Sequence, residues 1–361
     1  MPRLQIMGSA HIFAKVKLRS EEDLESWMKT FPDPSNSPAY HTHTLVFRGT
    51  TTDPRAVGSI QTFSRVTRLR LAIPESLEES DSLALFHKLS HTLKSLRVDF
   101  LFLSCTQILN FVCSFPLLED LTLSGIGLLL GNDDDPCGPQ TIAPSSSPAF
   151  TGTLDLAIYE GTGSIAPGLL DLPNGLHFRK FRWETAEDLE GITELVAGCS
   201  DTLECLDVAC NRSRAFVLVL RWSCDLHPCV GDSSPASIDL SKAIRLKDVA
   251  FWPEWQSVEW ITIALQTIKH QHLRQISICV HFGSVLTSLG ANVGQLVGEH
   301  VVLQWLDLDH LLAQLWESHF IRPRIISMTP DEEQGTRRDS IGCLLPEITT
   351  RGIIDLVERR A

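Results

Sequence analysis

Three segments of the chain read Val66-Thr67-Arg68-Leu69-Arg70-Leu71, Leu93-Lys94-Ser95-Leu96-Arg97-Val98 and Leu118-Glu119-Asp120-Leu121-Thr122-Leu123. Each segment has apolar residues at its first, fourth and sixth positions. Because side chains alternate between the two faces of a β-strand, the last two apolar residues would point to one face and their neighbours to the other. The segments therefore predict strands with one buried face, repeated along the chain.

The same phrase recurs along most of the sequence. Six further matches are Phe13-Val16-Leu18, Phe178-Phe181-Trp183, Leu203-Leu206-Val208, Leu246-Val249-Phe251, Leu273-Ile276-Ile278 and Leu303-Leu306-Leu308. Three weaker matches, with a polar residue or a proline in first position, centre on Leu45, Leu154 and Ile326. The central residues Leu69, Leu96 and Leu121 are 27 and 25 residues apart (69 to 96 and 96 to 121), close to the roughly 20–29 residues of a leucine-rich repeat.

Segments with helical spacing lie between several of the strands. Apolar residues recur at intervals of three and four in 108–115, 189–199 and 258–268, which favours amphipathic helices there. A strand followed by a helix cannot bury its apolar face alone, whereas stacked units share one core. We therefore expect an α/β fold: a leucine-rich-repeat-like solenoid, curved as a right-handed superhelix, with parallel strands on its concave side and helices on its convex side.

The solenoid is expected to occupy residues 1–345. Loop-like insertions are expected near 131–150, which is rich in Asp, Pro and Ser, and near 210–238. The tail at 346–361 has apolar residues at Ile348, Ile353, Ile354 and Val357. It is predicted to form a capping helix that shields the last strand from pairing with another chain.

The composition limits the classes of function. Of the 361 residues, 43% are hydrophobic and 21% are charged, which is typical of a globular protein. No apolar run approaches the roughly 20 residues of a membrane span, and the N-terminus lacks the apolar core of a signal peptide. The formal net charge of −13 should repel nucleic acid and anionic lipid. We expect a cytoplasmic or nuclear protein with reduced cysteines that binds neither nucleic acid nor membrane.

Four stretches carry a resemblance to a known family: 20–27, 37–45, 117–123 and 202–208. Through them the chain resembles leucine-rich-repeat proteins of the F-box type, and more closely the divergent F-box-like proteins of basidiomycete fungi. The resemblance implies a protein-recognition module related to the substrate receptors of cullin-type ubiquitin ligases. No F-box is recognisable before Phe13, where the repeats begin. A ubiquitin-ligase adaptor is therefore expected as a partner only if an F-box lies upstream.

Two patterns keep an enzymatic alternative open. Gly161-Thr162-Gly163-Ser164-Ile165-Ala166 follows a predicted strand as a dinucleotide-binding loop does, although Pro167 and Gly168 oppose the helix that such a loop needs. Cys224, His227 and Cys229 place soft metal ligands close together, without the paired Cys-x-x-Cys knuckles of a zinc site. The alternative is thus a nucleotide- or metal-dependent enzyme. The main expectation is a non-enzymatic protein with no catalytic residue, cofactor or metal.

The outward positions of the strands are the predicted binding site. They lie directly before, between or directly after the last two apolar residues of each phrase, so they point away from the core. Arg and Trp, which occur among them, are enriched where interfaces concentrate binding energy. We expect an unidentified protein partner of opposite polarity along this concave face. The outward positions begin with Lys15 and Lys17. The residues predicted to bind the partner are Arg48, Arg68, Arg70, Arg97, Lys180, Arg182, Asp207, Asp248, Trp252, Trp305, Asp307 and Asp309.

Overall fold

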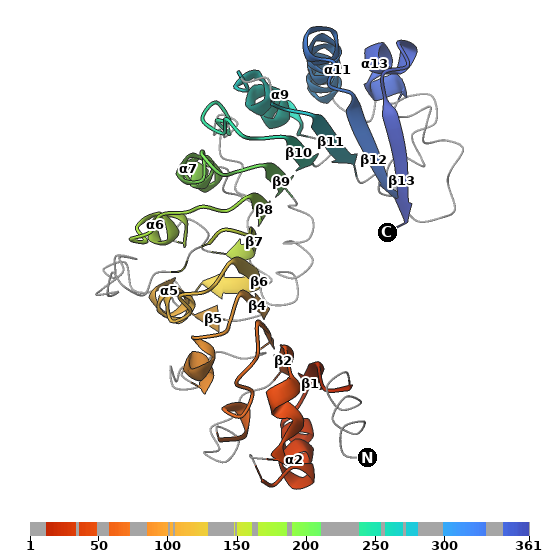
Figure 1. Cartoon of the computed structure of the whole chain (residues 1–361). Helices are drawn as coiled ribbons and strands as arrows, with labels where there is room; N and C mark the ends of the chain where they lie inside the picture. The colour runs from red at the N-terminus through yellow and green to blue at the C-terminus, as the bar shows by residue number, and fades with distance from the viewer. Residues whose placement is uncertain are drawn as a thin grey trace, which may run out of the picture. The chain divides into compact units, whose positions relative to one another are not determined.

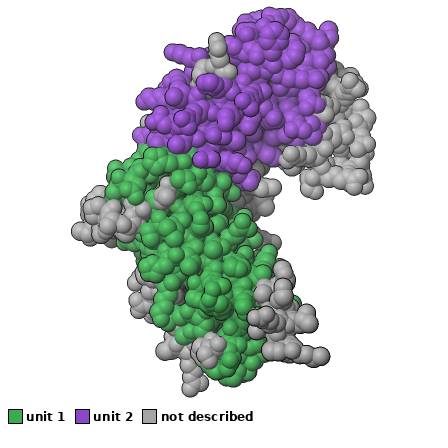
Figure 2. Space-filling model, viewed as in Figure 1, with its two compact units in different colours: residues 1–178 green, residues 179–361 purple. Residues whose placement is uncertain are grey.

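A computed structural model describes residues 12–33, 36–48, 58–72, 85–99, 102–103, 105–128, 148, 150–160, 165–185, 190–210, 238–253, 257–269, 272–280, 299–329 and 342–360. The chain divides into two compact units, which we call unit 1 (Met1–Phe178) and unit 2 (Arg179–Ala361) and which Figure 2 colours separately. Both units are α/β structures that combine a parallel sheet with helices.

Unit 1 contains a parallel sheet whose strands follow one another in sequence order. The order is β1-β2-β3-β4-β6-β7, and the short β5 pairs with β6. Helices α5 and α6 lie to one side of these strands (Figure 1). The elements are β1 (Lys15–Leu18), α2 (Glu21–Thr30), η2 (Pro38–His41), β2 (Thr44–Arg48), β3 (Arg68–Ala72), η3 (Leu85–Leu89), β4 (Ser95–Asp99), β5 (Phe102–Leu103), α5 (Cys105–Cys113), β6 (Asp120–Leu128), β7 (Thr153–Glu160) and α6 (Ile165–Leu170).

Unit 2 repeats this arrangement. Its parallel strands have the order β8-β9-β10-β11-β12-β13, and its helices again lie to one side (Figure 1). The elements are β8 (Lys180–Thr185), α7 (Glu190–Gly198), β9 (Cys205–Cys210), β10 (Asp248–Trp252), α9 (Glu259–Gln266), β11 (Gln275–Val280), α11 (Glu299–His319), β12 (Pro323–Thr329), α13 (Pro346–Thr350) and β13 (Asp355–Arg360).

One backbone contact links successive repeats in both units. The carbonyl of Thr67 accepts hydrogen bonds from the amides of Lys94 and Ser95, at 2.9 and 3.0 Å. Two consecutive amides at the start of the next strand are bound in the same way by the carbonyls of Ala14, His43, Lys94, Arg179, Glu204 and Lys247. The sequence repeat therefore has a direct counterpart in the backbone.

The apolar residues of the repeated phrase form the core. Leu69, Leu96 and Leu121 are neighbours in register and are 2%, 0% and 0% exposed. Leu206 and Val249 are paired and buried in the same way in unit 2. The three predicted helices are present as α5, α7 and α9, so the α/β fold with parallel strands is confirmed.

The prediction of a strand at Leu303-Leu306-Leu308 is wrong, because these residues lie in helix α11. The side chains that this helix buries are spaced by three or four residues and include Val301, Trp305, Leu308 and Leu312. Leu303 and Leu306, in contrast, are 60% and 39% exposed. The helical period therefore places on the surface two residues that the strand pattern assigned to the core.

The predicted capping helix at 346–361 is present only in its first part. Helix α13 has five residues, and the chain then reaches Gly352, whose φ of 65° is a conformation that glycine adopts without strain. Asp355–Arg360 form β13, which pairs in parallel with β12. The parallel sheet of unit 2 therefore continues beyond residue 345.

Several predictions fall outside the described residues. These concern most of the insertions near 131–150 and 210–238, which include Cys224, His227 and Cys229. The prediction of reduced cysteines is wrong at Cys105, which is disulfide-bonded, whereas Cys113, Cys199, Cys205, Cys279 and Cys343 are in the reduced, thiol form. Among the described helices, none has the length and apolar character needed to cross a bilayer.

Candidate functional site

The first four strands of unit 1 carry positive side chains at their outward positions. We call this set the basic face; it consists of Lys15, Lys17, Arg48, Arg68, Arg70 and Arg97. Arg70 is the register neighbour of Val46 on one side and of Arg97 on the other, and Val46 is the neighbour of Lys17. All six side chains are exposed or partly exposed. The structure thus brings the predicted residues Arg48, Arg68, Arg70 and Arg97 together on adjacent strands.

Two arginines of the basic face share one buried carboxylate, and we call the three residues the arginine clamp. Nε of Arg70 donates to Oδ2 of Asp99 at 2.6 Å, and Nε of Arg97 donates to Oδ1 of Asp99 at 2.8 Å. The Asp99 side chain is 2% exposed, while those of Arg70 and Arg97 are 40% and 43% exposed. Each carboxylate oxygen therefore fixes one guanidinium group, and neither bond uses a terminal guanidinium nitrogen.

Asp99 is absent from the predicted site residues, although a sequence signal for it exists. It directly follows Val98, the last apolar residue of its phrase, just as the predicted residues Arg48 and Trp252 follow theirs. An acidic residue at this position, two residues after an arginine, could have identified it. Asp120, another acidic residue of unit 1, has a different role, because its Oδ1 accepts the backbone amide of Thr153 at 2.7 Å.

The corresponding side of unit 2 carries both signs of charge. We call this set the mixed face; it consists of Lys180, Arg182, Glu184, Asp207, Asp248 and Trp252. The Arg182 guanidinium lies 3.8 Å from Oε2 of Glu184 and 3.9 Å from Oδ2 of Asp207. The indole Nε1 of Trp252 donates to Oδ1 of Asp207. The structure therefore brings these predicted residues together, with Asp207 at the centre of their contacts.

A free thiol lies beside the mixed face. Sγ of Cys205 donates to Oδ2 of Asp248 at 3.6 Å, and Asp248 is the register neighbour of Cys205. Burial, together with the negative charge of Asp248, raises the pKa of the Cys205 thiol. A raised pKa keeps the sulfur protonated and weakens it as a nucleophile or metal ligand.

The mixed face does not extend onto β11. Ser277 and Cys279, at outward positions of β11, are 6% and 2% exposed, so this strand is buried on both sides. Beyond it, Arg324 on β12 lies 3.7 Å from Asp355 on β13. Exposed outward positions in unit 2 are thus interrupted, whereas in unit 1 they run across four consecutive strands.

The last three predicted site residues do not belong to a strand face, because they lie on α11. Trp305 is 1% exposed and is a core residue, which contradicts its prediction as an exposed indole. Asp307 is exposed on the helix surface. Asp309 is 1% exposed, and its carboxylate accepts the backbone amides of Glu347 at 2.6 Å and Ile348 at 3.0 Å. Trp305, Asp307 and Asp309 are therefore removed from the candidate site.

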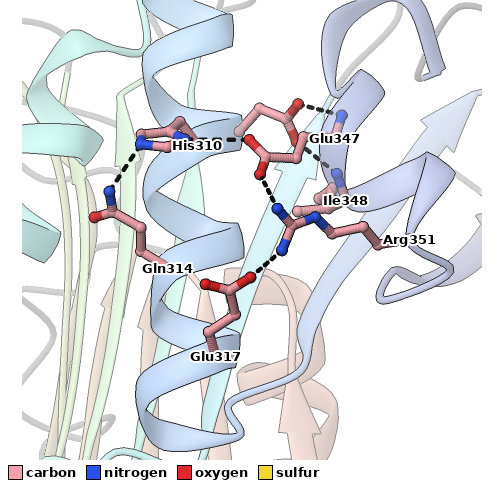
Figure 3. Close-up of polar contacts among 7 residues, drawn as sticks. His310, Gln314, Glu317, Glu347, Ile348 and Arg351 are labelled. Carbon is pink, nitrogen blue, oxygen red and sulfur yellow. Dashed lines mark hydrogen bonds and ion pairs between the residues drawn. The ribbon is translucent and has the colours of Figure 1, made fainter.

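Asp309 has a structural role at the start of α13. The N-cap residue of that helix, Leu345, makes no side-chain cap hydrogen bond, so Asp309 of α11 satisfies the first amides instead. Figure 3 shows the polar contacts around it: Nδ1 of His310 lies 3.2 Å from Oε2 of Glu347, and Arg351 pairs with both Glu347 and Glu317. Burial raises the pKa of Asp309, against the opposing effect of its two amide bonds. These contacts fasten α13 to α11.

The structure gives little support to the two sequence patterns that suggested an enzyme. A helix, α6, does begin at Ile165, so the expectation that Pro167 and Gly168 oppose a helix is wrong. That helix has only six residues, and residues 161–164 of the glycine-rich pattern lie outside the described part of the chain. Within the described ranges, no group of three or more His, Cys, Asp or Glu side chains could hold a metal ion.

Comparison with known proteins adds no assignment. No family model matches the chain, and no curated protein matches it. The basic face and the mixed face are therefore the observations from which a function can be inferred.

Proposed function

We propose that this chain is a non-enzymatic protein-interaction module of the leucine-rich-repeat type, and that its basic face binds an acidic segment of a partner protein. The observation that carries the proposal is the row of six positive side chains on four consecutive parallel strands, backed by a core to which none of them contributes. Side chains of this kind can change without disturbing the core, as a recognition surface requires.

The dimensions of the basic face suit an extended peptide. Neighbouring strands lie about 4.8 Å apart, so four strands extend over about 14 Å. An extended chain advances about 3.3 Å per residue, so about four residues of a partner could lie across the face. Acidic side chains in such a segment would meet positive charge at every strand, which favours both encounter and orientation.

A protein segment fits this face better than a nucleic acid does. Proteins that bind single-stranded nucleic acid usually place aromatic side chains where the bases can stack. The outward positions of β1 to β4 carry Lys, Arg, Thr, Val, Ala, Ser and Asp and no aromatic residue. The formal net charge of −13 also opposes a polyanion as large as nucleic acid, whereas a short acidic segment is affected mainly by nearby charges.

The proposal includes the finer architecture expected from the sequence. We propose that strands line the concave side and helices the convex side of a right-handed leucine-rich-repeat superhelix. The placement of helices to one side of the strands in each unit supports this (Figure 1). We further propose that the module recognises substrates in the manner of F-box-type receptors, with a ubiquitin-ligase adaptor as partner if an F-box lies upstream.

The test is binding of a fluorescent Glu-rich peptide to the wild-type chain and to two variants of equal net charge. The triple variant K17E/R48E/R68E reverses exposed charges of the basic face and spares the arginine clamp. The control K88E/K242E/K269E reverses three exposed lysines that lie outside the β-strands. We expect the first variant to bind at least about tenfold more weakly and the control to stay within about threefold of the wild type.

Equal weakening in the two triple variants would contradict the proposal, because it would show a response to overall charge alone. Circular dichroism and thermal melting of both variants ensure that folded proteins are compared. Binding by the wild type should also weaken as salt is raised, since exposed charges are screened.

A further inference from the structure

We propose that the outer edge of β13 is a self-association site, at which a second copy of this chain adds its own β13 in antiparallel orientation. Among the strands that the structure describes, β13 stands last in the order of unit 2 and pairs only with β12 (Figure 1). The basic face belongs to unit 1, so this association is independent of the proposed function.

The edge of β13 lacks the structural features that usually prevent strand pairing. An edge strand presents unpaired backbone N–H and C=O groups, and proteins protect such edges with proline, a bulge, a very short strand or a covering helix. β13 has six residues and no proline, and it pairs with Arg324–Thr329 without a register shift. Helix α13, the described part of the predicted capping helix, ends at Thr350, before the strand begins. Within the described ranges, the edge is therefore open to another strand.

β13 is held in place before a partner arrives. The amide of Ile353 donates to the carbonyl of Ile348 at 3.0 Å, and Nε of Arg322 donates to the carbonyl of Ile353 at 3.0 Å. Oδ2 of Asp355 lies 3.7 Å from Nε of Arg324 on β12, and the Asp355 side chain is 54% exposed. A strand that is already ordered loses less conformational entropy when a second strand binds.

The sequence of β13 complements itself in one antiparallel register. When Val357 stands opposite Val357 of the second copy, Asp355 of each copy stands opposite Arg359 of the other. Opposite charges at directly opposite positions stabilise an antiparallel pair. A two-fold axis through Val357 produces both charge pairs at once, which is the self-complementarity that an interface between two identical surfaces requires.

The charges of β13 disfavour the other pairings of the same two strands. A register centred on Glu358 places two glutamates at directly opposite positions, and like charges there are destabilising. A register centred on Leu356 pairs only residues 355–357 and forms no charge pair. A parallel pairing in register places each charged residue beside its own copy. The charges therefore select one arrangement, and they also discourage pairing with unrelated strands.

The small size of this contact predicts a weak dimer. It involves residues 355–359 of each copy, whereas stable complexes bury about 1,600 Å² in total. We expect a dissociation constant of about 10–100 μM. The chain should therefore be a monomer when dilute and a dimer at high concentration.

The test is sedimentation velocity of the full chain from about 1 to 500 μM, a range that brackets the expected dissociation constant. The variants are R359D, D355R and the double exchange D355R/R359D. Each single variant places like charges opposite each other at both pairs, and the double exchange restores opposite charges. The control K242E changes the net charge as R359D does, at an exposed lysine outside the β-strands. Circular dichroism and thermal melting ensure that folded proteins are compared.

We expect R359D and D355R each to weaken the dimer by about tenfold, and D355R/R359D and K242E to stay within about threefold of the wild type. D355R also loses the contact with Arg324, but the double exchange loses it equally, so its recovery would report the pairing between copies. Hydrogen exchange at the amides of β13 should slow as the concentration of the wild type rises.

A monomer at every concentration would overturn the proposal. Tighter association of D355R would also overturn it, because that result is expected if the net charge of −13 alone controls association. Equal weakening in R359D and K242E, or a double exchange as weak as the single variants, would exclude the proposed register. A dimer in which β13 exchanges as fast as in the monomer would place the contact on another surface.

Discussion

In unit 1, Arg70 and Arg97 share a carboxylate that is 2% exposed, whereas in unit 2 Arg182 lies 3.9 Å from Asp207, a carboxylate that is 34% exposed. Each arrangement lies on outward positions of neighbouring parallel strands within its own unit, above the same kind of core. The repeat therefore fixes where outward side chains stand and leaves their identity free. The two units use that freedom differently, one for a surplus of positive charge and the other for charges that neutralise one another.

The surplus of positive charge suits unit 1 to binding. In unit 2, Arg182 and Trp252 both contact Asp207, and Arg324 lies near Asp355, so opposite charges already meet within the face. A partner would have to compete with those contacts and to desolvate both members of each pair. On the basic face, Lys17, Arg48 and Arg68 offer exposed charge that a partner could neutralise directly.

The largest expected effect comes from the core that the two units share. Leu121→Asp places a carboxylate where the side chain is 0% exposed, and we expect a loss of about 4 kcal/mol or more in the free energy of unfolding. Thr122→Asp, one residue later, points to the outward side near Arg97 and should change stability by less than about 1 kcal/mol. Urea denaturation of both variants checks the pair, and similar losses would refute the assignment of inward and outward positions.

The next largest effect is a difference in stability loss between removing the buried carboxylate of unit 1 and removing the partly exposed carboxylate of unit 2. Asp99→Asn leaves two guanidinium groups without their shared charge, and we expect a loss of about 2 kcal/mol. Asp207→Asn removes a more exposed charge with longer contacts and should cost at most about 1 kcal/mol. Equal losses in urea denaturation would mean that the two faces do not differ as described.

A smaller effect is expected where unit 2 ends. Asp309→Ala removes the acceptor for the first amides of α13, and such caps contribute about 1 kcal/mol. Hydrogen exchange should become faster at Glu347 and Ile348, while amides of β3 and β4 in unit 1 keep their wild-type rates. Unchanged exchange at these two amides would show that Asp309 does not act as the cap.

The smallest effect is a dependence on pH. Burial raises the pKa of Asp309 above its ordinary value of 3.8, so the folded state binds this proton more tightly than the unfolded state does. Its contribution to stability is therefore complete below pH 3.8 and declines as pH rises through the raised value. Asp309→Asn has no such proton, so the stability of the wild type relative to this variant should fall as pH rises. A relative stability that increases over that range would have the wrong sign.

Most of the fold follows from the repeated phrase, because its period of two is specific to strands with one buried face. The phrase fails at Leu303-Leu306-Leu308, since apolar residues three and two apart also occur in a helix. There the wider spacing of Val301, Trp305, Leu308 and Leu312 is the deciding signal. At the C-terminal end, Gly352 marks the point where the helix stops and the strand begins, and apolar composition alone does not reveal it.

The candidate site was less accessible to prediction than the fold. Alternation along a strand predicts that Arg70 and Arg97 lie on the outward side; in the structure both are partly exposed and they are register neighbours. The bond between Arg97 and Asp99 joins residues two positions apart and lies within one phrase. The bond of Asp99 to Arg70 and that of Asp309 to Ile348 join residues 29 and 39 positions apart, and no single phrase contains both partners. Such contacts appear only when the repeats are stacked.

The most direct test of the central claim is zero-length carbodiimide cross-linking of a Glu-rich peptide to the full chain, with the coupled lysines identified by mass spectrometry. Lys15 and Lys17 are exposed on the basic face, Lys180 is exposed on the mixed face, and Lys29 and Lys88 are exposed outside the β-strands. We predict that coupling concentrates at Lys15 and Lys17 and declines in R48E/R68E. Coupling at Lys180 in equal yield, or spread evenly over the exposed lysines, would contradict it.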